Sequence, residues 1–169
     1  MTNTQRKALI GLGSNKAWHG KSPAEVLSLA AKALGSLGQG VRLSPLYCSP
    51  AWPDPSQPEY RNAVVCLESA LEPHALLAGL QVIEAGFGRV RSGDPALRYA
   101  PRTLDLDLLA VGDLVMEDVD LQLPHPRVPE RDFVLLPLRD VEPAWQHPIT
   151  GQSVSAMIKA LPIITCAKA

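Results

Sequence analysis

The stretch RYAPRTLDLDLL, residues 98–109, decides how the rest of the chain is interpreted. Its second half alternates leucine with aspartate, and alternation of apolar and polar residues is typical of a half-buried strand. Because successive side chains of a strand point to opposite faces, Asp105 and Asp107 share one face. The opposite face carries Leu104, Leu106 and Leu108. The stretch therefore predicts a strand, running to about Val111, that buries its leucines and presents two neighbouring carboxylates.

Arginine side chains are concentrated just before this strand. The four are Arg89, Arg91, Arg98 and Arg102. Two neighbouring carboxylates suit a hard cation such as Mg2+, and guanidinium groups suit phosphate oxygens. A solvated strand face beside a solvated loop would carry the same residue types, but like charges repel and Asp is rare in strands. The combination therefore favours a cation site beside a cationic loop, which is what a nucleoside triphosphate requires.

Length and charge narrow the classes of function. The chain has 169 residues, which fits one domain with a full core and leaves little room for a second. Its net charge of -1 argues against a protein that binds nucleic acid through bulk charge. Ten of the sixteen basic residues are Arg, and four of those lie between positions 89 and 102. This local basic charge favours a small anionic ligand.

The cysteines and the apolar runs indicate in which cellular compartment the protein is expected. Cys48, Cys66 and Cys166 are widely spaced and form no metal-ligand pattern. An odd number of cysteines without a signal-peptide pattern points to a reducing cytoplasm. No apolar run approaches the ~20 residues of a transmembrane helix. We therefore expect a cytoplasmic protein that does not associate with a membrane.

Sequence patterns predict a βαββαβ order. The strands are expected over residues 7–13, 41–49, 62–68 and 105–111. The first helix starts at Ser22, which caps it and forms a capping box with Glu25. The second helix starts at Glu72-Pro73, and its buried stripe is Leu76, Leu80, Ile83 and Phe87. This order predicts an α+β fold of the ferredoxin-like type, with helices packed on an antiparallel-type sheet and a C-terminal extension.

Four further segments carry distinct expectations. The GLGSN segment, residues 11–15, lacks the third glycine of a dinucleotide fingerprint, so a strand end with a turn is preferred to a phosphate loop. The loop over residues 50–58 contains four prolines and should be stiff and extended. The loop over residues 88–102 is long for a compact domain, which is typical of a functional segment. A last helix is expected from Ser153.

Five segments in order resemble the 6-hydroxymethyl-7,8-dihydropterin pyrophosphokinase family of folate biosynthesis. They are GLGSN (11–15), QPEYRNA (57–63), GRVR (88–91), RYAPRTLDLD (98–107), and LPHP through RDF (123–133). The resemblance runs from Ala8 to about Pro148. It implies a single catalytic domain over residues 1–169, with ATP as co-substrate and two Mg2+ ions. Such an enzyme transfers the β,γ-pyrophosphate of ATP to the hydroxymethyl group of the pterin and releases AMP.

The resemblance also implies the roles of individual residues. Asp105 and Asp107 would hold both ions, in agreement with their shared face. The pterin would stack between Tyr60 and Phe133, although a single aromatic residue is more often part of a core. The remaining residues implied at the pterin are Ser49, Pro50, Trp52 and Asn62. Asn62 would bond the pterin edge, or otherwise serve as a turn residue at the start of its strand.

The same resemblance implies a nucleotide site. Its catalytic cations are Arg89, Arg91, Arg98 and Arg102, whose loop would close over the reaction and exclude water. Further implied ATP contacts are Glu84, Tyr99, Leu108, His125 and Arg131. Glu84 could instead be a solvated helix end, and His125, between two prolines, could be purely structural. The chain offers no candidate nucleophile, so the substrate hydroxyl would attack directly.

Four departures from the family pattern stand out. Residues 92–97 make the arginine loop longer than in common members, Tyr99 replaces a frequent Trp, Pro126 replaces a frequent aromatic residue, and Ser49 replaces a frequent Thr. Two alternatives stay open. One is a non-catalytic nucleotide-sensing domain on the same scaffold, and the other, ranked last, is an RNA-binding module. The expected partners are ATP and a reduced pterin, with no nucleic acid, no membrane and no obligate oligomer.

Overall fold

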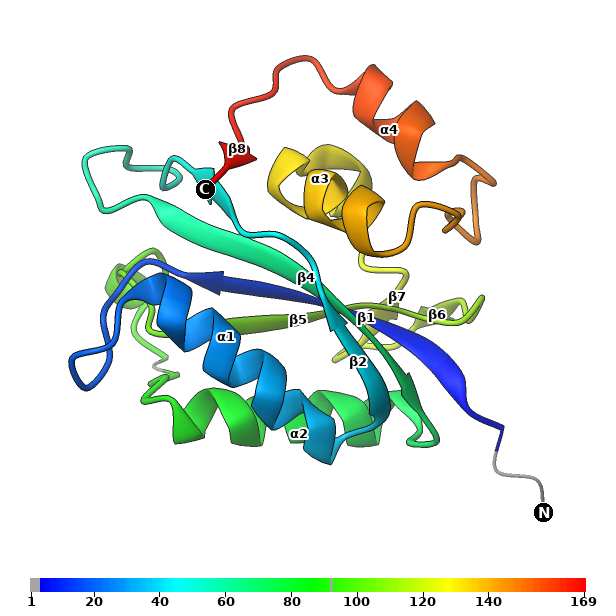
Figure 1. Ribbon diagram of the computed structural model, residues 1–169, viewed down its shortest axis with the longest axis horizontal. Coiled ribbons are helices and arrows are strands. Elements are labelled where there is room, and N and C mark those ends of the chain that lie inside the picture. Colours follow the sequence, from blue (N-terminus) through cyan, green and yellow to red (C-terminus); the bar gives the residue numbers. More distant parts are fainter. Residues whose placement is uncertain (1–3, 92) are drawn as a thin grey trace.

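The computed structural model describes residues 4–91 and 93–169, and its centre is an antiparallel sheet (Figure 1). Six strands form this sheet in the order β5-β1-β4-β3-β8, with β2 also paired to β4. Their bounds are β1 Arg6–Ser14, β2 Gln39–Leu43, β3 Tyr47–Ser49, β4 Tyr60–Ser69, β5 Asp105–Val111 and β8 Ala167–Lys168. The described residues also form a small second sheet from β6 (Met116–Glu117) and β7 (Gln122–Leu123).

The predicted ferredoxin-like order is confirmed, with one correction. The single strand expected over residues 41–49 is two strands, β2 and β3, and both pair with β4. Pro45 lies between them, and proline has no N–H to donate to a strand ladder. Ser44 bridges the gap, because its N–H donates to the Val64 carbonyl at 2.9 Å and its Oγ accepts from the Val64 N–H at 3.0 Å. Together, β2 and β3 therefore occupy the position beside β4 at which one continuous strand was expected.

Four α-helices cover the two faces of the sheet (Figure 1). They are α1 Pro23–Ala33, α2 Pro73–Gly86, α3 Asp132–Val141 and α4 Val154–Ala160. The predicted capping box is present, since Ser22 Oγ accepts from the Glu25 N–H and Glu25 accepts from the Ser22 N–H. Short 3-10 turns occur at Leu34–Ser36, Pro95–Leu97 and Val128–Glu130. No described helix combines the length and apolar character needed to cross a bilayer.

Each face of the sheet has its own core. One core lies between the sheet and the helices α1 and α2. It contains Leu76 and Leu80 of α2, with Ile83 and Phe87 half-buried at its margin, and the three leucines predicted to face away from the aspartates, which are Leu104, Leu106 and Leu108. The opposite core lies beneath α3 and α4 and contains Leu9, Val64, Cys66 and Leu109. The C-terminal extension expected after the last predicted strand contains α3, which begins at Asp132. The sheet is therefore buried on both sides, except where α3 stops short of its end.

Glu142 anchors the C-terminal end of α3 to two strands. Its carboxylate pairs with Lys7 Nζ at 3.0 Å and with Arg42 Nη2 at 2.7 Å, and its side chain is 13% exposed. Burial alone would raise the pKa of Glu142, but the hydrogen bonds from Lys7 and Arg42 outweigh it and hold the pKa below the ordinary 4.5. The charged form is therefore the one that the fold stabilises.

We expect Glu142→Ala to lower the free energy of unfolding by about 1–3 kcal/mol at neutral pH, since it leaves Arg42 without its partner. A group whose folded pKa is depressed contributes stability above its unfolded pKa, and this contribution is lost as the pH falls through the folded pKa. The difference between wild type and variant should thus shrink in urea unfolding below pH 4.5. An equal difference at neutral and acidic pH would contradict this assignment.

Candidate active site

A cavity of about 600 Å3 opens on the sheet face that carries α3, just beyond the N-terminus of that helix. The strands β1, β4 and β5 form its floor. Along each of them, the residues on this face change from polar or glycine near the cavity to apolar beneath α3. Towards the cavity the floor positions are Asp105 and Asp107 on β5, Gly11 and Gly13 on β1, and Asn62 on β4. Beneath α3 the same face continues with Leu9, Val64 and Leu109. The helix therefore covers the apolar end of the face and leaves the polar end open.

The glycines of β1 keep this floor clear. Gly11 pairs with Asp107, and Gly13 pairs with Asp105 on one side and Asn62 on the other. Residues paired directly across strands point to the same face, so side chains at these positions would occupy the floor. A Cβ on Gly13 would already lie 3.6 Å from Asn62 Oδ1. Residues 11–14 form the end of β1, as predicted, but their place in the pocket follows from strand register and was not predicted.

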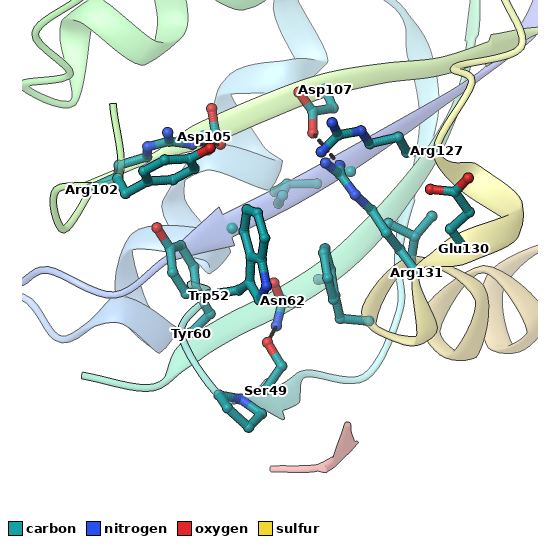
Figure 2. Close-up of a pocket in the computed structure, with 18 of the residues that line it drawn as sticks. Ser49, Trp52, Tyr60, Asn62, Arg102, Asp105, Asp107, Arg127, Glu130 and Arg131 are labelled. Carbon is teal, nitrogen blue, oxygen red and sulfur yellow. Dashed lines mark hydrogen bonds and ion pairs between the residues drawn. The ribbon is translucent and has the colours of Figure 1, made fainter. Parts of the chain in front are cut away.

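The two aspartates share a face, as predicted, and both meet arginines (Figure 2). Asp105 Oδ2 pairs with Arg102 Nη1 at 2.7 Å, and its Oδ1 lies 3.9 Å from Arg89 Nη2. Asp107 Oδ2 lies 3.6 Å from Arg131 Nη1. Burial and the charge of Asp105 raise the pKa of Asp107 to about 6, despite Arg131. Burial and the neighbouring carboxylate therefore outweigh the effect of Arg131 on the pKa of Asp107.

The arginine loop contributes donors that have no partner. The Nε atoms of Arg89 and Arg102 are buried, and neither makes a hydrogen bond within the described part of the chain. Arg102, Arg98 and Tyr99 line the cavity, whereas Arg89 lies outside its wall. Arg102 Nη2 donates to the Arg98 carbonyl oxygen, so the loop is closed on itself at this point. An unpaired buried donor is costly, which is consistent with a ligand that carries acceptor oxygens.

Glu84 and Arg91 lie outside the cavity wall, and they pair with each other. Glu84 is buried, which raises its pKa, and its Oε1 accepts from the Leu106 N–H at 2.7 Å. The interpretation of Glu84 as a solvated helix end is therefore wrong. Its carboxylate connects α2, the start of β5 and the arginine loop.

The residues expected at the pterin all line one half of the cavity. They are Ser49, Pro50, Trp52, Tyr60, Asn62 and Phe133. Asn62 Nδ2 donates to Ser49 Oγ at 2.9 Å (Figure 2). Trp52 meets Tyr99 edge to face, with ring centroids 5.5 Å apart. The loop over residues 50–58 and the arginine loop therefore touch each other at the cavity. We call this half, with the six residues above, the ring-binding half.

His125 is neutral in this structure. Its Nδ1 accepts from the Arg127 N–H at 3.2 Å, which leaves the proton on Nε2. Burial and the nearby charges of Arg131 and Arg127 lower the pKa of His125 to about 4. The His125 side chain does not line the cavity. Leu108 lies in the core between the sheet and the pair α1 and α2, so any nucleotide contact of Leu108 would have to be through its backbone.

Besides the glycines of the floor, Arg127 and Asn15 had no role assigned from the sequence. Arg127 lines the cavity beside Arg131 (Figure 2), and its guanidinium makes no ion pair among the described residues. Asn15 is buried, accepts from the Arg102 N–H at 2.8 Å and donates to the Pro58 carbonyl at 3.0 Å. Asn15 therefore joins the arginine loop to the segment before Tyr60. The available signals were a second Arg close to Arg131 and the Asn of GLGSN, which the sequence analysis quoted without assigning a role.

Comparison with known proteins gives consistent matches. A family model described as 7,8-dihydro-6-hydroxymethylpterin-pyrophosphokinase (HPPK) matches residues 9–143. A 2-amino-4-hydroxy-6-hydroxymethyldihydropteridine pyrophosphokinase of Pseudomonas aeruginosa is 37% identical over 159 residues, which is 93% of each chain. A Synechocystis protein of the same name is 42% identical over 118 residues, 70% of this chain and 58% of the relative.

Longer proteins match over part of their length. The folic acid synthesis protein fol1 of Pneumocystis carinii is 38% identical over 121 residues, and the match covers 72% of this chain but 16% of the relative. The solved Plasmodium falciparum HPPK-DHPS superimposes with a TM-score of 0.71 at 13% identity, covering 92% of this chain and 44% of that chain. At this identity the superposition supports the fold alone.

Proposed function

Because this chain belongs to the HPPK family, whose members are transferases, we propose that it transfers pyrophosphate from ATP to 6-hydroxymethyl-7,8-dihydropterin. The products would be AMP and the pterin diphosphate. The observation that carries the proposal is a single cavity that joins an acid pair and arginines to the ring-binding half. Its volume of about 600 Å3 lies within the usual range of small-molecule sites. We assign this function to one domain over residues 1–169, since one sheet underlies both cores.

Divalent cations fit the acid pair. Within the described residues, no group of three or more His, Cys, Asp or Glu side chains could hold a metal ion without other ligands. Mg2+, however, is usually held by one or two carboxylates together with substrate phosphates and water. Burial and, after it, the charge of Asp105 raise the pKa of Asp107, and a bound cation would stabilise its ionised form. We propose that Asp105 and Asp107 hold two Mg2+ ions, which would supply charge neutralisation at the phosphate oxygens.

The arginines would change partners when ATP binds. In the free protein Arg102 and Arg89 face Asp105, and Arg131 faces Asp107. When the carboxylates hold cations, these guanidiniums become available to phosphate oxygens, to which they bind in a bidentate manner. The unpaired Nε atoms of Arg89 and Arg102 add donors on the same side chains. We extend this role to Arg98 and to Arg127, which forms no ion pair with any residue that the structure describes.

The ring-binding half would hold the flat heterocycle. Tyr60 and Phe133 supply aromatic faces, each worth about 1 kcal/mol beyond the area that it buries. Asn62 carries an amide that can bond the polar edge of a pterin, and its bond to Ser49 orients it. The hydroxyl oxygen of the substrate would then attack the β-phosphorus of ATP, the bond from that phosphorus to the oxygen that stays with AMP would break, and the hydroxyl proton would be released to water. No covalent intermediate on the protein is required.

One assay separates this function from the alternatives. The purified protein is incubated with ATP, Mg2+ and the reduced pterin alcohol, and AMP is quantified. We expect AMP that depends on the pterin, in equal amounts with the pterin diphosphate. A nucleotide-sensing domain would bind ATP without releasing AMP, and that outcome would replace the enzymatic assignment with the alternative.

A further inference from the structure

We propose that Asp132 and the C-terminal segment that it holds, residues 165–169, position the ring-binding half of the cavity. This segment lies beyond the family match, which ends at residue 143. It joins α3 to β3, the two elements on which Phe133 and Ser49 are placed. The inference rests on the proposed function, since it concerns the affinity for the pterin.

Asp132 is a buried carboxylate that binds the segment without a cation. It is 8% exposed and forms no ion pair among the described residues. Its Oδ2 accepts from the Thr165 N–H at 2.6 Å, from Thr165 Oγ1 at 3.1 Å and from the Cys166 N–H at 2.9 Å. Its Oδ1 accepts from the Phe133 N–H at 2.7 Å. One side chain therefore connects the segment to the residue that would stack on the pterin.

The other end of the segment is bound to β3. Cys48 pairs with Ala167 and Tyr47 pairs with Lys168, while the Ala169 N–H donates to the Leu46 carbonyl at 2.9 Å. Figure 2 shows β8 beside the part of the chain that carries Ser49. The strand β8 thus covers the edge of β3 immediately before Ser49. This edge pairing leaves β3 hydrogen-bonded on both sides, to β4 and to β8.

A second set of contacts fastens β8 to α3. Asp140 accepts from the Tyr47 hydroxyl at 2.6 Å, and Lys168 Nζ lies 3.2 Å from the same carboxylate. Asp140 is on α3, Tyr47 on β3 and Lys168 on β8. The segment is therefore held to the helix at two points, at Asp132 near the cavity and at Asp140 farther along.

Polar contacts, more than burial, determine where the segment lies. Residues 162–165 are exposed, and Ile163 is 71% exposed, so this part adds little to a core. Cys166 is the one buried residue among 161–169. The chain therefore carries a connection between the two walls of the ring-binding half that contributes little apolar burial of its own. Because stacking depends on where the ring lies, a shift of either wall weakens pterin binding, and nucleotide binding is unaffected.

The test compares Asp132→Ala with Glu142→Ala. Both variants remove a carboxylate from an end of α3, but the partners of Glu142 are Lys7 and Arg42, neither of which belongs to the segment. Binding of a 6-hydroxymethylpterin and of an ATP analogue is measured by calorimetry, with thermal unfolding in parallel. We expect Asp132→Ala to weaken pterin binding about tenfold and to change ATP-analogue binding less than about twofold. Glu142→Ala should lower the Tm and leave both affinities unchanged.

Two milder variants test the same contact if Asp132→Ala is poorly folded. Thr165→Val removes one hydroxyl donor and should raise the KM for the pterin with kcat retained, whereas Thr165→Ser keeps the donor and should restore the wild-type KM. Equal loss of pterin and nucleotide affinity in Asp132→Ala, or an unchanged pterin affinity, would overturn the inference. Failure of the proposed function is a separate result, because the wild-type protein would then form no pterin-dependent AMP.

Discussion

Asp107→Asn is expected to lower kcat by about a thousandfold or more, because it removes a ligand charge from the acid pair that would hold the cations. Metal-ion stabilisation of a transferring phosphoryl group is worth several kcal/mol, and each 1.36 kcal/mol is tenfold in rate. The substitution keeps the shape of the side chain, so the fold should persist. Steady-state AMP release at saturating ATP, pterin and Mg2+ measures the effect.

The same variant should be more stable than wild type when metal is removed. The pKa of Asp107 is raised by burial and by Asp105, so its negative charge opposes folding at neutral pH. An uncharged amide removes this repulsion, and thermal unfolding in EDTA should show a higher Tm. Asp113→Asn, in the exposed turn after β5, is the control and should change neither quantity. Full activity of Asp107→Asn would contradict the metal assignment.

Arg102→Lys should lower kcat about 100-fold to 1,000-fold, although the positive charge is kept. Arg102 pairs with Asp105 at 2.7 Å, and its buried Nε makes no hydrogen bond with any described residue. Its planar guanidinium can therefore bind the Asp105 carboxylate in the free protein and a phosphate when ATP is bound. Lysine offers a point charge and cannot form bidentate bonds. Removal of one preorganised donor to a developing charge typically costs this much in kcat.

Arg42→Lys is the matched control for this prediction. Arg42 also pairs with a carboxylate at 2.7 Å, but it lies on β2, outside the cavity wall. We expect its kcat and KM values to equal those of wild type. If Arg102→Lys kept kcat within about threefold of wild type, Arg102 would be only a partner of Asp105. The proposal that its guanidinium binds a phosphate of ATP would then be wrong.

The structure shows the surroundings of three of the four departures from the family pattern. Tyr99 stands where many members carry Trp, yet its ring still meets Trp52 edge to face. The longer segment before Arg98 includes the short 3-10 turn Pro95–Leu97. Pro126 precedes Arg127, which faces the cavity. The contact between Trp52 and Tyr99 shows that the two loops can meet without Trp at position 99.

The sequence by itself determined the elements whose signals are local. The alternation in residues 104–108 assigns leucines to one core and aspartates to the opposite face, because strand geometry has a period of two residues. The capping box at Ser22 and Glu25 marks a helix start through contacts three residues apart. The order of these elements was enough for the ferredoxin-like fold. The residues that the family motifs imply at the pterin all line the cavity.

Only the tertiary structure decided which side chains meet across the sheet. Gly13 stands between Asp105 and Asn62 because of strand register, which no local pattern reports. Glu84 is buried because the N–H of Leu106, 22 residues away, meets its carboxylate, whereas its position in the helix alone suggested solvent. Asp132 binds Thr165 across 33 residues. Such contacts depend on where distant elements pack, so these roles became visible only in the folded chain.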